Sequence, residues 1–121
     1  MPEDMQQQLV EFERNRVQLL SVSAQKQQFQ LQSNTMAQSI EELEKTKEKK
    51  VFKAVGNILV QSDTEKVRKE LVEKKESLDL RIKSLQKQED SLVNRLNKLK
   101  SDIENAQSAA VQQEASAEEK S

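Results

Sequence analysis

The chain contains no cysteine and no histidine, and it has a single glycine, Gly56, and a single proline, Pro2. The lack of cysteine excludes a disulfide framework and thiol nucleophiles, and the lack of histidine removes the most common general base of enzymes. One glycine cannot build the glycine-rich loops that hold nucleotide phosphates. We therefore expect no catalytic residues, no cofactor and no metal site, and we expect that the protein is not an enzyme.

Aromatic and apolar residues are also scarce, at 2% and 34% of the sequence, while 34% of residues are charged. Such a composition cannot fill a globular core and is typical of a coiled coil or a long helix. The net charge is −1, which gives no general attraction to nucleic acid or to anionic membranes. No segment approaches the roughly 18 apolar residues of a membrane span, and the first residues lack the pattern of a signal peptide. We expect a soluble, cytoplasmic protein with no nucleic-acid or membrane partner.

The first part of the chain, residues 4–48, has the pattern of a coiled-coil helix. Alternating steps of three and four residues define a largely apolar seam, which consists of Met5, Gln8, Phe12, Asn15, Leu19, Val22, Lys26, Phe29, Ser33, Met36, Ile40 and Leu43. The polar residues in this seam, such as Asn15 and Lys26, either specify register and partner or weaken the coil and make it flexible. The sequence leaves both interpretations open.

The later part, residues 62–107, has a more regular heptad pattern. Leucine recurs every seven residues, at Leu71, Leu78, Leu85, Leu92 and Leu99. Lys75 and Glu89 are polar members of the second seam row, with the same two interpretations. Ser62 followed by Glu65 predicts a capping box that starts the helix at Ser62. The last residues, 108–121, are small and polar, and we expect a frayed helix that passes into a flexible tail.

A stretch of different composition, VFKAVGNILV at residues 51–60, separates the two helical segments. Gly56 and Asn57 lie at its centre, and a type II′ turn requires a glycine at its first central position because φ is positive there. The stretch therefore predicts a β-hairpin over residues 51–61 with a positive φ at Gly56. The flanking helical segments are nearly equal in length, which favours an antiparallel pair.

The predicted hairpin has apolar side chains on both faces. A two-residue turn places valine and isoleucine on one face, at Val51, Val55, Ile58 and Val60, and the remaining apolar residues on the other, at Phe52, Ala54 and Leu59. A two-stranded hairpin is marginally stable in water, and its unpaired edges can bind another chain. We expect the hairpins of several subunits to assemble through Val51, Phe52, Ala54, Val55, Gly56, Asn57, Ile58, Leu59 and Val60. The alternative is a connecting hairpin that folds back on its own coiled coil.

The sequence resembles the β-type subunits of prefoldin, the hexameric co-chaperone of archaea and eukaryotes. The resemblance extends from about Met5 to Gln107, and its most specific part is VFKAVGNILV. A single hairpin is similar to the β type, whereas EKTKEKK replaces the acidic or proline-containing turn that often precedes the first strand in this family. The resemblance implies a mainly α, single prefoldin-like domain over residues 1–121. In it, a long antiparallel two-helix coiled coil carries a central β-hairpin that joins an inter-subunit β-barrel.

The resemblance also implies a function and partners. It implies an ATP-independent holding chaperone that binds unfolded client proteins at its coiled-coil tips and delivers them to a group II chaperonin. It further implies a hetero-hexamer with prefoldin α-type subunits and other β-type copies. Apolar seam residues at frayed tips are the expected client contacts: Met5, Leu9, Phe12, Leu99 and Ile103. For these residues the alternative is complete pairing in the coil, and for the protein it is a structural coiled-coil adaptor or tether without client binding.

Overall fold

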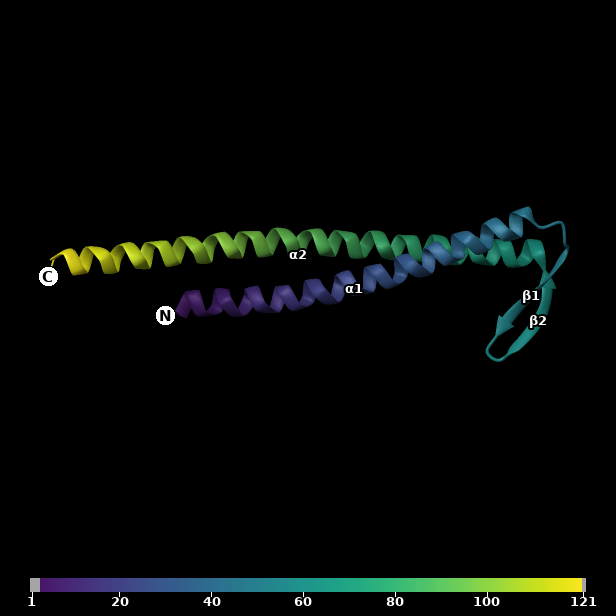
Figure 1. Cartoon of the computed structure of the whole chain (residues 1–121), viewed down its shortest axis with the longest axis horizontal. Coiled ribbons are helices and arrows are strands. Elements are labelled where there is room, and N and C mark those ends of the chain that lie inside the picture. The colour runs from purple at the N-terminus through teal and green to yellow at the C-terminus, as the bar shows by residue number, and fades with distance from the viewer. Residues whose placement is uncertain (1–2, 121) are drawn as a thin grey trace. The chain divides into compact units, whose positions relative to one another are not determined.

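Two long antiparallel helices and a central β-hairpin make up the fold (Figure 1). The computed structural model describes residues 3–120, and the side chains of residues 4–113. The elements follow one another as α1 (Glu3–Lys45), β1 (Lys50–Val55), β2 (Ile58–Asp63) and α2 (Thr64–Lys120). The mainly α fold class expected from the sequence is confirmed. Within the described residues, no helix is long and apolar enough to cross a membrane.

The described chain divides into two compact units, each of which contains a segment of both helices. The terminal unit holds the residues up to Ala24 and those from Gln86 onward, and the hairpin unit holds Gln25–Leu85. The buried apolar side chains of the terminal unit lie on the predicted seams, at Met5, Val22, Leu92, Leu99 and Ile103. In the hairpin unit, Leu85 and the polar Ser33 are buried. The heptad pattern therefore identifies the residues that face the partner helix.

The first helix ends at Lys45, three residues before the predicted end at Glu48. Thr46 still donates its N–H to Glu42 at 3.0 Å, but its side-chain oxygen accepts the N–H of Glu48 at 3.2 Å. A side-chain hydroxyl that binds a nearby backbone N–H competes with the helical hydrogen bonds. Thr46 thus explains the end of α1 without a glycine or proline.

The second helix begins later and ends later than the sequence predicted. Ser62 and Asp63 extend β2, where they pair with Val51 and Lys50, so Ser62 does not form the predicted N-cap and α2 begins at Thr64. At the other end, the structure describes helix as far as Lys120, where the sequence predicted a flexible tail from residue 108. This segment is rich in alanine, glutamine and glutamate, which are strong helix formers, and contains no glycine or proline.

The hairpin has the register that the sequence predicted. Val55 pairs with Ile58 and Ala54 with Leu59, in an antiparallel ladder that extends to Lys50. Gly56 has a φ of 59°, and among the described residues no non-glycine residue has a positive φ. A positive φ at the first central residue alone matches a type II′ turn rather than a type I′ turn, which needs positive φ at both positions. The predicted turn type and the positive φ at Gly56 are confirmed.

Candidate functional site

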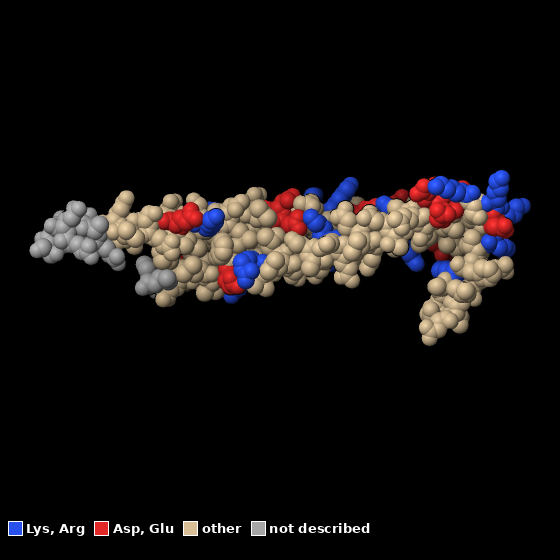
Figure 2. Space-filling view, in the orientation of Figure 1, with Lys and Arg blue, Asp and Glu red and all other residues tan. Residues whose placement is uncertain are grey.

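The hairpin presents apolar side chains to solvent on the face that carries Phe52, Ala54 and Leu59, here called the phenylalanine face. Phe52 is 69% exposed and Leu59 is 71% exposed. Figure 2 shows no Lys, Arg, Asp or Glu on the visible surface of the hairpin near its turn. Large apolar side chains that gather on an exposed surface mark an interaction site. The phenylalanine face therefore has the character of a surface that another chain covers.

The opposite face of the hairpin carries Val51, Lys53, Val55, Ile58, Val60 and Ser62, and is here called the valine face. Its side chains near the turn are also exposed, whereas Val51 and Lys53 near the base are half-buried. Lys53 Nζ donates a hydrogen bond to Glu70 Oε2 of α2 at 3.0 Å. This bond and the positive charge of Lys53 lower the pKa of Glu70. The valine face is thereby linked to α2 at its base, and both faces stay accessible at the turn.

The base of the hairpin is held by a cluster of hydrogen bonds. Thr64 donates its N–H to the carbonyl oxygen of Lys49 at 3.0 Å, and its hydroxyl to the carbonyl oxygen of Glu48 at 2.7 Å. Lys50 and Asp63, which face each other across the ladder, form an ion pair. The hydrogen bond from Lys50 lowers the pKa of Asp63. These contacts join the start of α2 to the loop before β1, and β1 to β2, and fix where the hairpin leaves the helix.

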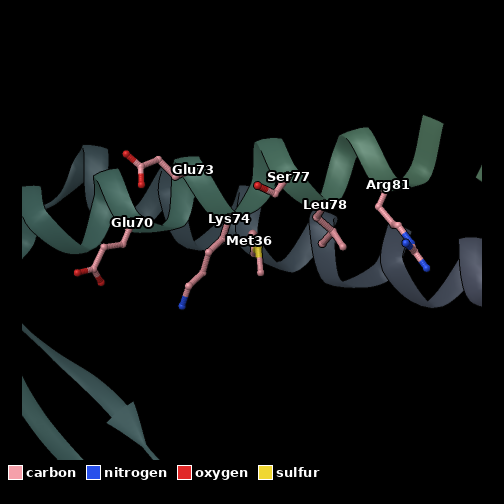
Figure 3. A pocket seen from close by; sticks show the side chains of 7 residues that line it. All are labelled: Met36, Glu70, Glu73, Lys74, Ser77, Leu78 and Arg81. Carbon is pink, nitrogen blue, oxygen red and sulfur yellow. The ribbon is translucent and has the colours of Figure 1, made fainter. Parts of the chain in front are cut away.

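A shallow groove of about 570 Å³ lies in the hairpin unit (Figure 3). Met36 of α1 and Leu78 of α2 supply its apolar part, and Lys74 and Arg81 extend along the same side of α2. Glu70, the partner of Lys53, also lines it. No group of three or more metal-binding side chains occurs in the described part of the chain. The groove can bury an apolar side chain between charged neighbours, but it offers no arrangement for a reaction.

The expected client contacts lie in the seam of the terminal unit. Met5 is 6% exposed, and Leu99 and Ile103 are each 8% exposed, while Leu9 and Phe12 are half-buried. The sequence analysis expected partial exposure at frayed tips. The structure instead shows three of these side chains buried, which matches the alternative that they pair in the coil. Client contact through them requires the two helices of this unit to separate.

Other apolar residues of the terminal unit are exposed, and the sequence analysis did not include them among the expected client contacts. On α1, Val10 is 57% exposed, Val17 is 53% exposed and Leu20 is 59% exposed. On α2, Val93 and Val111 are 40% and 64% exposed. The heptad pattern identifies only the residues that face the partner helix, and these residues lie on other faces of the helix. The seven-residue spacing of Val10 and Val17, off the seam, is the signal that could have found them.

Polar side chains cross between the two helices in each unit. In the terminal unit, Ser23 Oγ donates a hydrogen bond to Glu89 Oε2 at 2.7 Å. In the hairpin unit, Ser33 Oγ donates to Asp79 Oδ1 at 2.6 Å, and Lys75 Nζ donates to Asp79 Oδ2 at 2.8 Å. Both bonds lower the pKa of Asp79, and the bond from Lys75 has the larger effect. The sequence analysis singled out Lys75 and Glu89 as polar seam residues, but it missed their neighbours Ser23 and Asp79.

A family model, curated proteins and a solved structure each match this chain over most of its length. A family model described as "Prefoldin subunit" matches residues 6–110. The prefoldin subunit beta of Archaeoglobus fulgidus is 39% identical over 106 residues, which cover 87% of this chain and 91% of that protein. That of Pyrobaculum calidifontis is 36% identical over 104 residues, covering 85% and 83%. The crystal structure of the prefoldin beta subunit from Thermococcus strain KS-1 is similar with a TM-score of 0.80 and 33% identity, covering 87% of this chain and 93% of that one.

Proposed function

Because the chain belongs to the prefoldin family, as a subunit of the β type, we propose that it is one arm of an ATP-independent holding chaperone that binds unfolded proteins. Prefoldin is a family of non-enzymatic chaperones that act as hetero-oligomers, so the chaperone role follows from family membership. The finer steps are our proposal: clients are held by the arms and delivered to a group II chaperonin. Since prefoldins are generally cytosolic, we place this activity in the cytoplasm.

The observation that carries the proposal is the exposed hairpin. A chain that only tethered two partners would need a simple turn between its helices, whereas this chain exposes Phe52 and Leu59 on a two-stranded sheet. Each strand has one partner, so each leaves an outer edge with unpaired backbone groups. We propose that prefoldin α-type subunits and other β-type copies cover these edges and both apolar faces. The resulting hetero-hexamer would bring several arms to one client.

The client contacts are proposed to lie in the terminal unit. Met5, Leu9, Phe12, Leu99 and Ile103 line its seam and become accessible when the ends of the helices separate. Helix ends open more easily than helix centres, and weak apolar contacts on several arms add up through avidity. Such contacts suit a client that is unfolded, because an unfolded chain presents many short apolar segments to separate arms.

The test uses the assembled complex with an α-type subunit and a β chain that is shortened at both ends, to residues 13–98. A control chain that ends at residue 113 keeps all five proposed contacts. Suppression of aggregation is measured by light scattering with guanidine-unfolded citrate synthase. We expect the control to hold the client as the full chain does, and the doubly shortened chain to lose most of this activity.

Two results would overturn parts of the proposal. Undiminished holding by the doubly shortened assembly would reject the tip contacts. An intact assembly that does not suppress aggregation at all would favour the alternative, a coiled-coil adaptor without client binding.

A further inference from the structure

Two serine–carboxylate hydrogen bonds between the helices share a common arrangement. Ser23 donates to Glu89 at 2.7 Å in the terminal unit, and Ser33 donates to Asp79 at 2.6 Å in the hairpin unit. Along the sequence, the step from Ser23 to Ser33 equals the step from Asp79 to Glu89. Both bonds therefore follow the same antiparallel register of α1 and α2.

The two bonds also have the same direction. Each hydroxyl donor lies on α1 and each carboxylate acceptor lies on α2. Ser33 is 5% exposed, the one polar residue among the described residues that is buried, and Asp79 is half-buried. Glu89 is half-buried as well, and a hydrogen bond to a charged acceptor is stronger than one between neutral groups. At these two positions, α1 therefore supplies the donors and α2 the acceptors of the bonds between the helices.

Self-pairing is a real alternative for α2. Its leucines recur every seven residues at Leu71, Leu78, Leu85, Leu92 and Leu99, a pattern that also forms coils between identical helices. A complex with several copies of this chain brings several such helices near one another. If two copies of α2 paired, Asp79 and Glu89 would lose the serine donors that only α1 supplies. Polar seam residues are known to set coiled-coil partners in this way.

We infer that Ser23 and Ser33 on α1, together with Asp79 and Glu89 on α2, are specificity-determining residues that select pairing of α1 with α2 over pairing of α2 with α2 of a second copy. The carboxylates disfavour pairing of two α2 helices, and the serines stabilise pairing of α1 with α2 by donating hydrogen bonds to them. Lys75 adds a second donor to Asp79 from the same helix, at 2.8 Å. Gln86 Nε2 likewise donates to Glu89 Oε1 at 3.3 Å from the same helix. Donors on α2 are present in both pairings, whereas the two serine donors are present only when α1 is the partner.

The test measures pairing between copies of the full chain by chemical cross-linking. An equimolar mixture of ¹⁴N- and ¹⁵N-labelled chain is cross-linked through lysine, and mass spectrometry counts links between differently labelled copies. The count is restricted to α2 lysines away from the hairpin, so that assembly through the hairpin does not contribute: Lys83, Lys87, Lys98 and Lys100. We expect the variant Asp79→Leu/Glu89→Leu to raise these links several-fold over the wild type.

Two matched variants separate specificity from other effects. Glu76→Leu/Glu104→Leu adds the same leucines at exposed positions of α2 and should leave the links at the wild-type level. Ser23→Leu/Ser33→Leu removes the donors that favour the α1–α2 pair but keeps the carboxylates that disfavour the α2–α2 pair, so the links should rise less than in the Asp79/Glu89 variant. The inference is overturned if the Asp79/Glu89 variant stays at the wild-type level, or if either matched variant raises the links equally.

Discussion

At Asp79, the surroundings of one carboxylate make the stability of the hairpin unit depend on pH. Hydrogen bonds from Lys75 and then Ser33 hold its pKa below the ordinary value of 3.8. A carboxylate with a lowered folded-state pKa stabilises the fold above its unfolded-state pKa, and this contribution is lost as the pH falls through the folded-state value. The ion pair with Lys75 is partly exposed, so much of its effect is screened by solvent. The bond from the buried Ser33 is the part that depends on helix pairing.

We predict that Ser33→Ala lowers the midpoint of thermal unfolding at pH 7 and has little effect at a pH well below 3.8, where Asp79 is protonated in both variants. Loss of one hydrogen bond to a charged group corresponds to a decrease of several degrees in a chain of this size. Circular dichroism at 222 nm across the pH range measures it. Ser21→Ala, an exposed serine on the same helix, is the control and should show no such pH dependence. A Ser33→Ala effect that is equal at both pH values would contradict the assignment.

Individual residues differ in how well the sequence reveals them. Gly56 could be predicted, because a type II′ turn excludes almost every other residue and the chain has one glycine. Ser23 and Asp79 could not, since they lie beside the seam and acquire a role only when the opposite helix places a partner against them. The exposure of Phe52 was predicted from its place on a hairpin face, whereas for Met5 the sequence left exposure and burial open, and the structure shows burial.

The hairpin as an element is stabilised inside one chain mainly at its base. Thr64, Lys50 and Lys53 connect the base to the loop before it and to α2. Toward the turn, Leu59 and Ile58 are 71% and 61% exposed. An isolated pair of strands is marginal, so the turn region of the hairpin depends on neighbouring chains for burial.

We predict that Phe52→Ser/Leu59→Ser strongly weakens assembly with an α-type subunit while the helices remain intact. Burial of a large apolar side chain is worth about 1.5–3 kcal/mol, so two of them correspond to at least a roughly 100-fold loss of subunit affinity. Analytical ultracentrifugation gives the affinity and circular dichroism the helix content. Leu80→Ser, which removes a leucine of 67% exposure from α2, is the control. Equal affinities for all three proteins would show that the phenylalanine face is not covered on assembly.

At the start of α2, the local sequence signal for a helix is overridden by strand pairing. Ser62 and Glu65 have the spacing of a capping box, but Ser62 pairs with Val51 in the ladder, so the strand continues and the helix begins at Thr64. The sequence predicted the existence, order and type of every element, because heptads and the glycine turn are strong patterns. It missed several of their ends, because these depend on single contacts: the start of α2 on strand pairing and the bond from Thr64 to Glu48, and the end of α1 on the local bond between Thr46 and Glu48.

At the scale of the whole molecule, each of the two units has a seam between its own helical segments, and the hairpin is left uncovered for other chains. Within the described residues, no large side chain is fully buried, and the apolar residues that are left exposed include five in the hairpin: Phe52, Val55, Ile58, Leu59 and Val60. A chain with so little interior gains much of its stability from association. This is the physical reason why a β-type prefoldin subunit works as part of a hetero-oligomer.

The last prediction therefore concerns the mass of the chain in solution. Alone, at 13.9 kDa, it should form small or concentration-dependent species, because its own hairpins cannot satisfy every edge. Mixed with an α-type subunit that carries two hairpins, it should form a single complex of six subunits whose mass does not change on dilution. Multi-angle light scattering distinguishes the two states. A monomer or dimer that the partner leaves unchanged would mean that the exposed hairpin is not an assembly element, and would favour the adaptor hypothesis.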